Sequence, residues 1–183
     1  MTRLNHVEPA NAEGEAKDLL ESVQKQLGMV PNFMKVFANS PPTLAAFLGL
    51  NGNLHRGSLD HKTRERIALL AAEENGCQYC VSAHTALGDK AGLSEDEMLA
   101  ARTGGSADPK ADAAVKFAKA VIENKGDVTT AELNAAREAG FNEAEIVEII
   151  GHVGLNTLTN LFAKAAQIDI DFPEVELLAT AAS

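Results

Sequence analysis

Apolar residues recur at helical spacing along almost the whole chain, and no stretch shows the alternation that is typical of a strand. Leu19, Leu20, Val23 and Leu27, for example, form one stripe that ends at Gly28. Aromatic residues make up only 4% of the chain and tryptophan is absent, so the core must come mainly from Ala, Leu, Ile and Val. That composition favours closely packed helices. The sequence therefore predicts an all-α fold.

The length of 183 residues suits one domain with an appended arm. We expect a single domain over residues 1–173, with an N-terminal helical segment (1–57), a core motif (58–104) and a second half (109–166). Helical spacing breaks at Pro173, so residues 167–183 are predicted to form a C-terminal arm that packs on the body or on a neighbouring subunit.

Two segments of the chain echo each other. "AGLSEDEM" begins at residue 91 and "AGFNEAEI" at residue 139, an offset of 48 residues. Each contains the spacing of a capping box, Ser94 with Glu97 in the first and Asn142 with Glu145 in the second. A duplicated helical unit is one hypothesis for this echo; the other is chance, since such caps recur in many helices.

The charge and the apolar runs exclude several classes of partner. A net charge of −10 would repel nucleic-acid phosphates and anionic lipid headgroups, so we expect neither nucleic acid nor a membrane as partner. The longest apolar run, "IALLAA", has six residues, and the first residues lack the apolar core of a secretory signal. We therefore expect a cytoplasmic protein, in which two cysteines indicate catalysis or metal binding.

Both cysteines lie in the segment "ENGCQYCVSAHT", directly after the helix breaker Asn75–Gly76. If a helix begins at Cys77, then Cys77, Cys80 and His84 share one face. The His84 imidazole can then withdraw the proton of the Cys80 thiol, while the helix N-terminus favours a thiolate at Cys77. The arrangement predicts an activated nucleophile, a base and a second sulfur that can close a disulfide.

Polar residues on two other predicted helices are further candidates. Glu65 has Ala68, Leu69 and Ala72 along its face, where a carboxylate is costly unless it is paired or used. It could orient His84 or relay protons, or form a structural ion pair. The three polar residues His152, Asn156 and Asn160 form a stripe on an apolar helix; we expect interhelical hydrogen bonds there first and site lining second. His6, His55 and His61 are expected to be solvated.

A zinc site is the alternative to redox chemistry. Cys77, Cys80 and His84 could supply three ligands, with His61 or Glu65 as the fourth. Structural zinc usually draws its ligands from two separated pairs, however, and the sequence has no second pair. We expect redox chemistry with no bound metal and no cofactor.

The stretch "KTRERIALLAAEENGCQYCVSAH" resembles the carboxymuconolactone decarboxylase superfamily, in its alkylhydroperoxidase D-like, peroxidase-related branch. The shared pattern is a glutamate, eleven residues, Cys-x-x-Cys, three residues and a histidine, here Glu65, Cys77, Cys80 and His84. The flanks "VPNFMKVFANSP" and "GHVGLNTLTNLFAKAAQIDIDFP" resemble the longer members, so the likeness covers about residues 28–173. Decarboxylases of the superfamily generally lack the cysteine pair, so lactone decarboxylation is not implied.

The resemblance implies paired antiparallel helices assembled as a homo-oligomer, a trimer or hexamer, that reduces hydroperoxides. Cys80 would attack the peroxide and become a sulfenic acid, Cys77 would resolve it as a disulfide, and Glu65 and His84 would relay protons. An external dithiol, such as a dihydrolipoyl group on a partner protein, would reset the pair.

One position departs from the family pattern. Tyr79 stands between the cysteines where the best-known pattern has a histidine of the proton relay. With His152 it is a candidate for lining the site. The departure keeps open a protein disulfide reductase or redox sensor with little peroxidase activity, and a zinc-stabilised oligomer without enzymatic activity.

Overall fold

The computed structural model describes residues 2–178, and within them every regular element is helical, which confirms the predicted all-α class. A short 3-10 turn, Pro9–Asn11, precedes nine α-helices in this range. They are α1 Gly14–Leu27, α2 Asn32–Phe37, α3 Pro41–Leu54, α4 His61–Glu74, α5 Gln78–Lys90, α6 Glu95–Arg102, α7 Pro109–Glu123, α8 Thr130–Glu138 and α9 Glu143–Ala166.

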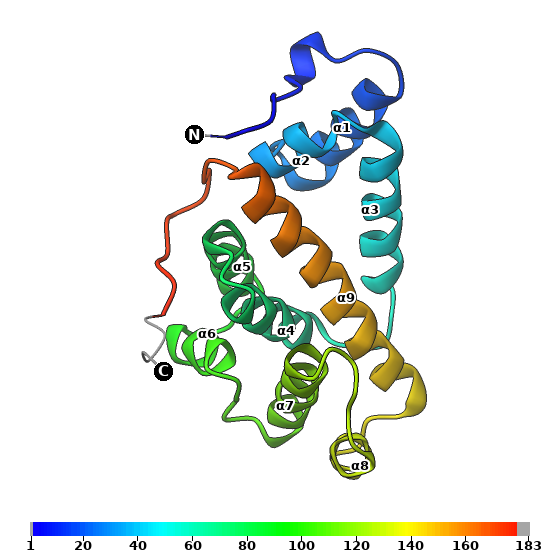
Figure 1. The fold of residues 1–183 in the computed structure, drawn as a ribbon, viewed down its shortest axis with the longest axis vertical. Coiled ribbons are helices and arrows are strands. Elements are labelled where there is room, and N and C mark those ends of the chain that lie inside the picture. The colour runs from blue at the N-terminus through cyan, green and yellow to red at the C-terminus, as the bar shows by residue number, and fades with distance from the viewer. Residues whose placement is uncertain (1, 179–183) are drawn as a thin grey trace.

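The longest helix, α9, runs through the middle of the molecule, with α1–α3 on one side and α4–α7 on the other (Figure 1). It contacts α3, α4, α5 and α7. By length and composition α9 could also cross a membrane, but 50% of the qualifying window is buried inside the fold. That burial is the packing of a core helix.

Two clusters of buried apolar residues stabilise the fold. The first joins α1–α3, Ala72 of α4, α5 and the C-terminal half of α9, and its aromatic residues Phe33, Phe37, Phe47 and Phe162 contact one another. The second joins α4, α7, α8 and the N-terminal half of α9. Since α4 contributes residues to both clusters, it lies at the junction between them.

The sequence echo corresponds to a repeated order of helix starts. Both predicted capping boxes are confirmed, at the start of α6 and at the start of α9. The same offset of 48 relates two further N-caps: Asp60 accepts a hydrogen bond from the backbone of Thr63 before α4, and Asp108 from that of Ala111 before α7. The units α4–α6 and α7–α9 thus share two helix starts aligned at the offset of 48, those of their first and last helices, which supports the duplication hypothesis.

Beyond Gln167 the chain is extended and lies along α5 and α6 of the same subunit. The Ser82 hydroxyl accepts a hydrogen bond from the Val175 backbone at 3.0 Å, and Arg102 donates to the Glu176 carbonyl at 2.7 Å. Residues 168–178 therefore pack on the body, the first of the two arrangements expected for the arm. The predicted arm's last residues, 179–183, lie outside the described residues, and the predicted division into domains stays a prediction.

Candidate functional site

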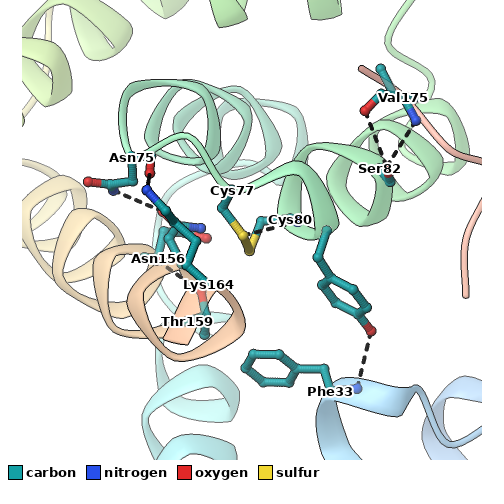
Figure 2. The surroundings of a disulfide bond; sticks show 11 residues. Phe33, Asn75, Cys77, Cys80, Ser82, Asn156, Thr159, Lys164 and Val175 are labelled. Carbon is teal, nitrogen blue, oxygen red and sulfur yellow. Dashed lines mark hydrogen bonds between the residues drawn. A yellow bond between two sulfur atoms is a disulfide. The ribbon is translucent and has the colours of Figure 1, made fainter. Parts of the chain in front are cut away.

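The two cysteines lie at the N-terminus of α5, directly after the turn from α4. Gly76 adopts φ +61° in that turn, a conformation that favours glycine. Cys77 is the N-cap of α5, so the helix begins one residue later than predicted. The Sγ of Cys77 accepts a hydrogen bond from the Cys80 backbone N–H at 3.3 Å. The two residues form a disulfide (Figure 2). Cys77 is 1% exposed and Cys80 4%, so the pair is shielded from bulk solvent.

Glu65, on α4, lies directly against His84 of α5. Its Oε2 is 2.9 Å from Nδ1 of His84, and its Oε1 is 3.5 Å from Nε2 of His61. Burial alone would raise the pKa of Glu65, but the neighbouring His84, His61 and His55 outweigh burial and hold the pKa below its usual value. An ionised Glu65 accepts a hydrogen bond from Nδ1–H of His84 in the tautomer that carries its proton on Nδ1, and Nε2 of that imidazole is then free to accept a proton.

These groups line one cavity of about 420 Å³, between α4–α5 on one side and α2, α3 and α9 on the other. Cys80, Glu65 and His84 all belong to its lining, whereas Cys77 does not. Of the two cysteines, Cys80 is therefore the one that a ligand in the cavity would contact. The remaining wall is largely apolar and includes Phe33, Met34, Phe47, Leu155 and Phe172.

A polar cluster lies behind the disulfide, on α9 and the end of α4 (Figure 2). Asn75 donates to Oδ1 of Asn160 at 2.9 Å, and Lys164 donates to the Asn75 carbonyl at 2.6 Å. The expected interhelical hydrogen bond is thus confirmed for Asn160. The same prediction is wrong for Asn156, whose side-chain amide donates to the His152 carbonyl within α9 at 2.8 Å. Asn156 lines the cavity.

His152 also lines the cavity, and its Nε2 is buried without a hydrogen-bond partner among the described residues. Burial, reinforced by the positive charge of Arg64, lowers the pKa of His152 to about 4. The imidazole is consequently neutral at neutral pH. Its placement matches site lining rather than interhelical bonding.

Tyr79 ties three segments together at the edge of the cavity. Its hydroxyl donates to Oδ1 of Asp171 on the arm at 2.9 Å and accepts a hydrogen bond from the backbone of Phe33 on α2 at 3.3 Å. The ring of Phe172 packs edge-on against the phenol, with centroids 5.8 Å apart. Burial and the Asp171 carboxylate raise the pKa of Tyr79, so the phenol stays protonated and serves as a donor.

Sequence reasoning missed three residues of the cavity. His55 and His61 are exposed, as expected, but both stand at its lining, so that four of the five histidines surround one cavity. The spacing of His61 and Glu65, i and i+4 on one helix, was a usable signal. Arg64 lines the cavity as well, although its neighbour Arg66 points elsewhere and pairs with Glu97 at 2.6 Å.

The zinc hypothesis gains no support from this geometry. Within residues 2–178 no three His, Cys, Asp or Glu side chains converge in a way that could hold a metal ion.

Comparison with known protein families gives one match. The family model of the carboxymuconolactone decarboxylase family matches residues 41–123, which include α3 to α7 and the whole Glu65–His84 motif. No curated protein sequence matches the chain significantly.

Several solved structures share the fold. A peroxidase-related protein from Ralstonia eutropha JMP134, with an alkylhydroperoxidase AhpD core, is 24% identical with a TM-score of 0.84 over 93% of this chain and 92% of that one. A peroxidase-related protein from Silicibacter sp. TM1040 is 26% identical, with a TM-score of 0.79 over 92% of this chain and 91% of that one. The debrominase Bmp8, in complex with tribromopyrrole, is 18% identical, with a TM-score of 0.79 over 93% and 92%.

Proposed function

Since this chain belongs to the carboxymuconolactone decarboxylase superfamily, in its alkylhydroperoxidase D-like branch, we propose that it is a thiol-dependent peroxidase acting on hydroperoxides. The observation that carries the proposal is the lining of one cavity by Cys80 and by the hydrogen-bonded Glu65–His84 pair. The fold alone does not decide the reaction, because a debrominase shares it.

The proposed cycle begins with the reduced pair. His84 Nε2 takes the Cys80 proton, and the thiolate attacks the outer peroxide oxygen; an S–O bond forms, the O–O bond breaks, and the leaving alkoxide takes up a proton as an alcohol. Cys80 is thereby oxidised to a sulfenic acid. The Cys77 thiol then attacks that sulfur, the S–S bond forms and water leaves. Glu65 keeps the His84 ring in the tautomer that this sequence of steps needs.

An external dithiol completes the cycle by two thiol–disulfide exchanges, in which the disulfide is reduced and the dithiol becomes a disulfide. The deep burial of Cys77 and Cys80 favours a slender donor that can enter the cavity, such as a dihydrolipoyl group carried by a partner protein. The same burial speaks against the alternative of a protein disulfide reductase, because a folded protein's disulfide could not reach Cys80 without opening the arm or α2.

Tyr79 takes a positioning role in this scheme rather than a place in the proton relay. Its protonated hydroxyl is committed to Asp171 and Phe33 and holds the arm, with Phe172, against the cavity.

The function is tested by peroxide turnover with dihydrolipoamide as donor. Wild-type protein should consume organic hydroperoxide catalytically, and Cys80→Ser should reduce the rate by at least about a thousandfold, since the nucleophile is lost. Unchanged turnover in Cys80→Ser would contradict the proposal. Fast exchange with a protein disulfide beside negligible peroxide turnover would favour the reductase instead.

We further propose a homo-oligomer, a trimer or hexamer, built on the outer face of α9. Val147, Ile150, Leu158 and Leu161 follow helical spacing there, and Val147 and Leu161 remain 66% and 59% exposed. Such an apolar stripe is typical of a surface that a second copy covers. Light scattering should show an oligomer that Leu161→Lys weakens; a wild-type monomer at micromolar concentration would contradict this assembly.

A further inference from the structure

The cavity differs in charge from the molecule around it. The chain has a net charge of −10, yet the cavity lining contains two permanent cations, Arg64 and Lys90, and a single carboxylate, Glu65. That carboxylate is already engaged by His84 and His61. The positive charges of Arg64 and Lys90 are therefore not neutralised within the cavity.

Arg64 has unused hydrogen-bonding capacity. Its Nη1 donates to the His55 carbonyl at 2.6 Å, and its Nε is buried without a partner among the described residues. No carboxylate of residues 2–178 pairs with Arg64 or with Lys90. The side of a guanidinium formed by Nε and Nη2 is the fork that binds a carboxylate through two hydrogen bonds. A buried donor without a partner is costly, so a ligand that supplied an acceptor would be favoured.

The rest of the lining determines which kind of chemical group the cavity can bind beside the charged end of a ligand. Apolar side chains dominate it, and they come from the α1–α2 connection, α2, α3, α5, α9 and the arm. They include Met29, Phe33, Met34, Phe47, Leu155 and Phe172. Such walls suit a hydrocarbon or aromatic group and give no partner to a hydrophilic one.

We propose that the cavity selects hydroperoxides that have an apolar body and a carboxylate, with the carboxylate bound at Arg64 and Lys90 and the peroxide group at Cys80. The assignment of the peroxide end rests on the proposed peroxidase function; the recognition of the carboxylate does not. Hydrogen peroxide lacks both features and is a poor ligand for this cavity.

Binding can be measured without any peroxide. The probes are para-isopropylbenzoate and its neutral amide, para-isopropylbenzamide, titrated calorimetrically into the oxidised full-length protein. We expect the benzoate to bind about tenfold more tightly or better, the ratio that one charge-assisted hydrogen bond supplies. Arg64→Gln should reduce that ratio to near one. Lys90→Gln, at an exposed position where no buried contact is lost, should reduce it by a smaller factor.

The matched control is Lys116→Gln, which removes one positive charge on α7, outside the cavity lining. It should leave the benzoate preference intact. Equal affinity for the two probes, absence of binding by either, a preference that survives Arg64→Gln and Lys90→Gln, or a preference lost in Lys116→Gln would each overturn the inference. Because turnover is not measured, a failed peroxidase assay would leave this result standing, and the reverse holds as well.

Discussion

The two helical units of this protein share a scaffold but not a chemistry. In α4–α6 and in α7–α9, aspartate N-caps at residues 60 and 108 start the first helix, and capping boxes start the last. The middle helices differ: α5 begins at Gln78, whereas α8 begins at Thr130, four residues later than the offset of 48 would place it. The extra turn of α5, residues 78–81, contains Cys80 and directly follows the N-cap Cys77.

The residues of the second unit that correspond to the site residues cannot serve as thiols or as a carboxylate in the proposed peroxidase reaction. At the offset of 48, Cys77 and Cys80 correspond to Lys125 and Val128, and Glu65 corresponds to Ala113. Caps and helix lengths therefore account for the fold in both units, while one added turn and a few side chains account for the site in the first.

Among the changes that test this comparison of the two units, breaking the Glu65–His84 pair should have the largest effect. Glu65→Gln keeps the shape of the side chain but removes the carboxylate that orients His84, so kcat/KM for hydroperoxide should fall about a hundredfold. The control is Glu132→Gln in the second unit, at the position that corresponds to His84, which should leave kcat/KM within about twofold. A Glu65→Gln enzyme with wild-type kinetics would remove the proton relay from the account.

The arm hydrogen-bonds to α5 and α6 of the first unit and to Asn32 of α2, and weakening its attachment should give the next largest effect. Tyr79→Phe leaves the buried side of Asp171 with one partner fewer, which should lower the free energy of unfolding by about 2 kcal/mol. Amide hydrogen exchange in residues 168–178 should accelerate in the same variant. The matched change Ser82→Ala removes a neutral hydrogen-bond partner of the arm and should cost less; a larger cost for Ser82→Ala would contradict the role given to Tyr79.

His152 belongs to the second unit but serves the cavity of the first, and pH reveals its burial. Its pKa is about 4 in the folded protein and 6.5 as the ordinary value. Between these values the unfolded chain binds the proton and the folded chain does not, so stability rises with pH across this window and is lost as pH falls. The slope should approach about 1.4 kcal/mol per pH unit.

Urea unfolding of wild type and His152→Gln at several pH values within this window is the measurement. The difference in stability between them should grow with pH and level off above the ordinary histidine pKa. A parallel curve for His152→Gln would show that its ring titrates normally in the folded state.

The smallest effects should be equal in the two units. Ser94→Ala and Asn142→Ala each remove the N-cap side chain of a capping box and should lower the unfolding free energy by about 1 kcal/mol. Neither change should alter the Cys80 chemistry. A much larger loss of unfolding free energy from one cap than from the other would show that the two units do not depend on their caps in the same way.

Local features of this protein could be predicted from sequence, because their causes are local. Capping boxes, the break at Gly76 and the shared face of Cys80 and His84 depend on residues within one helical turn. Even Glu65 could be placed, since a lone carboxylate on an apolar face must find a partner.

The contacts that sequence could not predict join distant segments. Tyr79 meets Asp171 across 92 positions, and Asn75 meets Asn160 across 85. Arg64 and Glu65 are consecutive on α4, where successive side chains point about 100° apart, yet both line the cavity because α2, α3 and α9 surround that end of α4. Such placements follow from the packing of whole helices, for which no pattern within one helix is a guide.

Cys80, and not Cys77, is the proposed site of peroxide attack, and trapping its first oxidation product tests this assignment. Reduced Cys77→Ala protein is treated with stoichiometric organic hydroperoxide and dimedone, and each cysteine-containing peptide is analysed by mass spectrometry; Cys80→Ala is treated in parallel. This assignment of Cys80 predicts a dimedone adduct on Cys80 in the first variant, formed much faster than any adduct on Cys77 in the second. An adduct that forms preferentially on Cys77, with Cys80 unmodified, would contradict it.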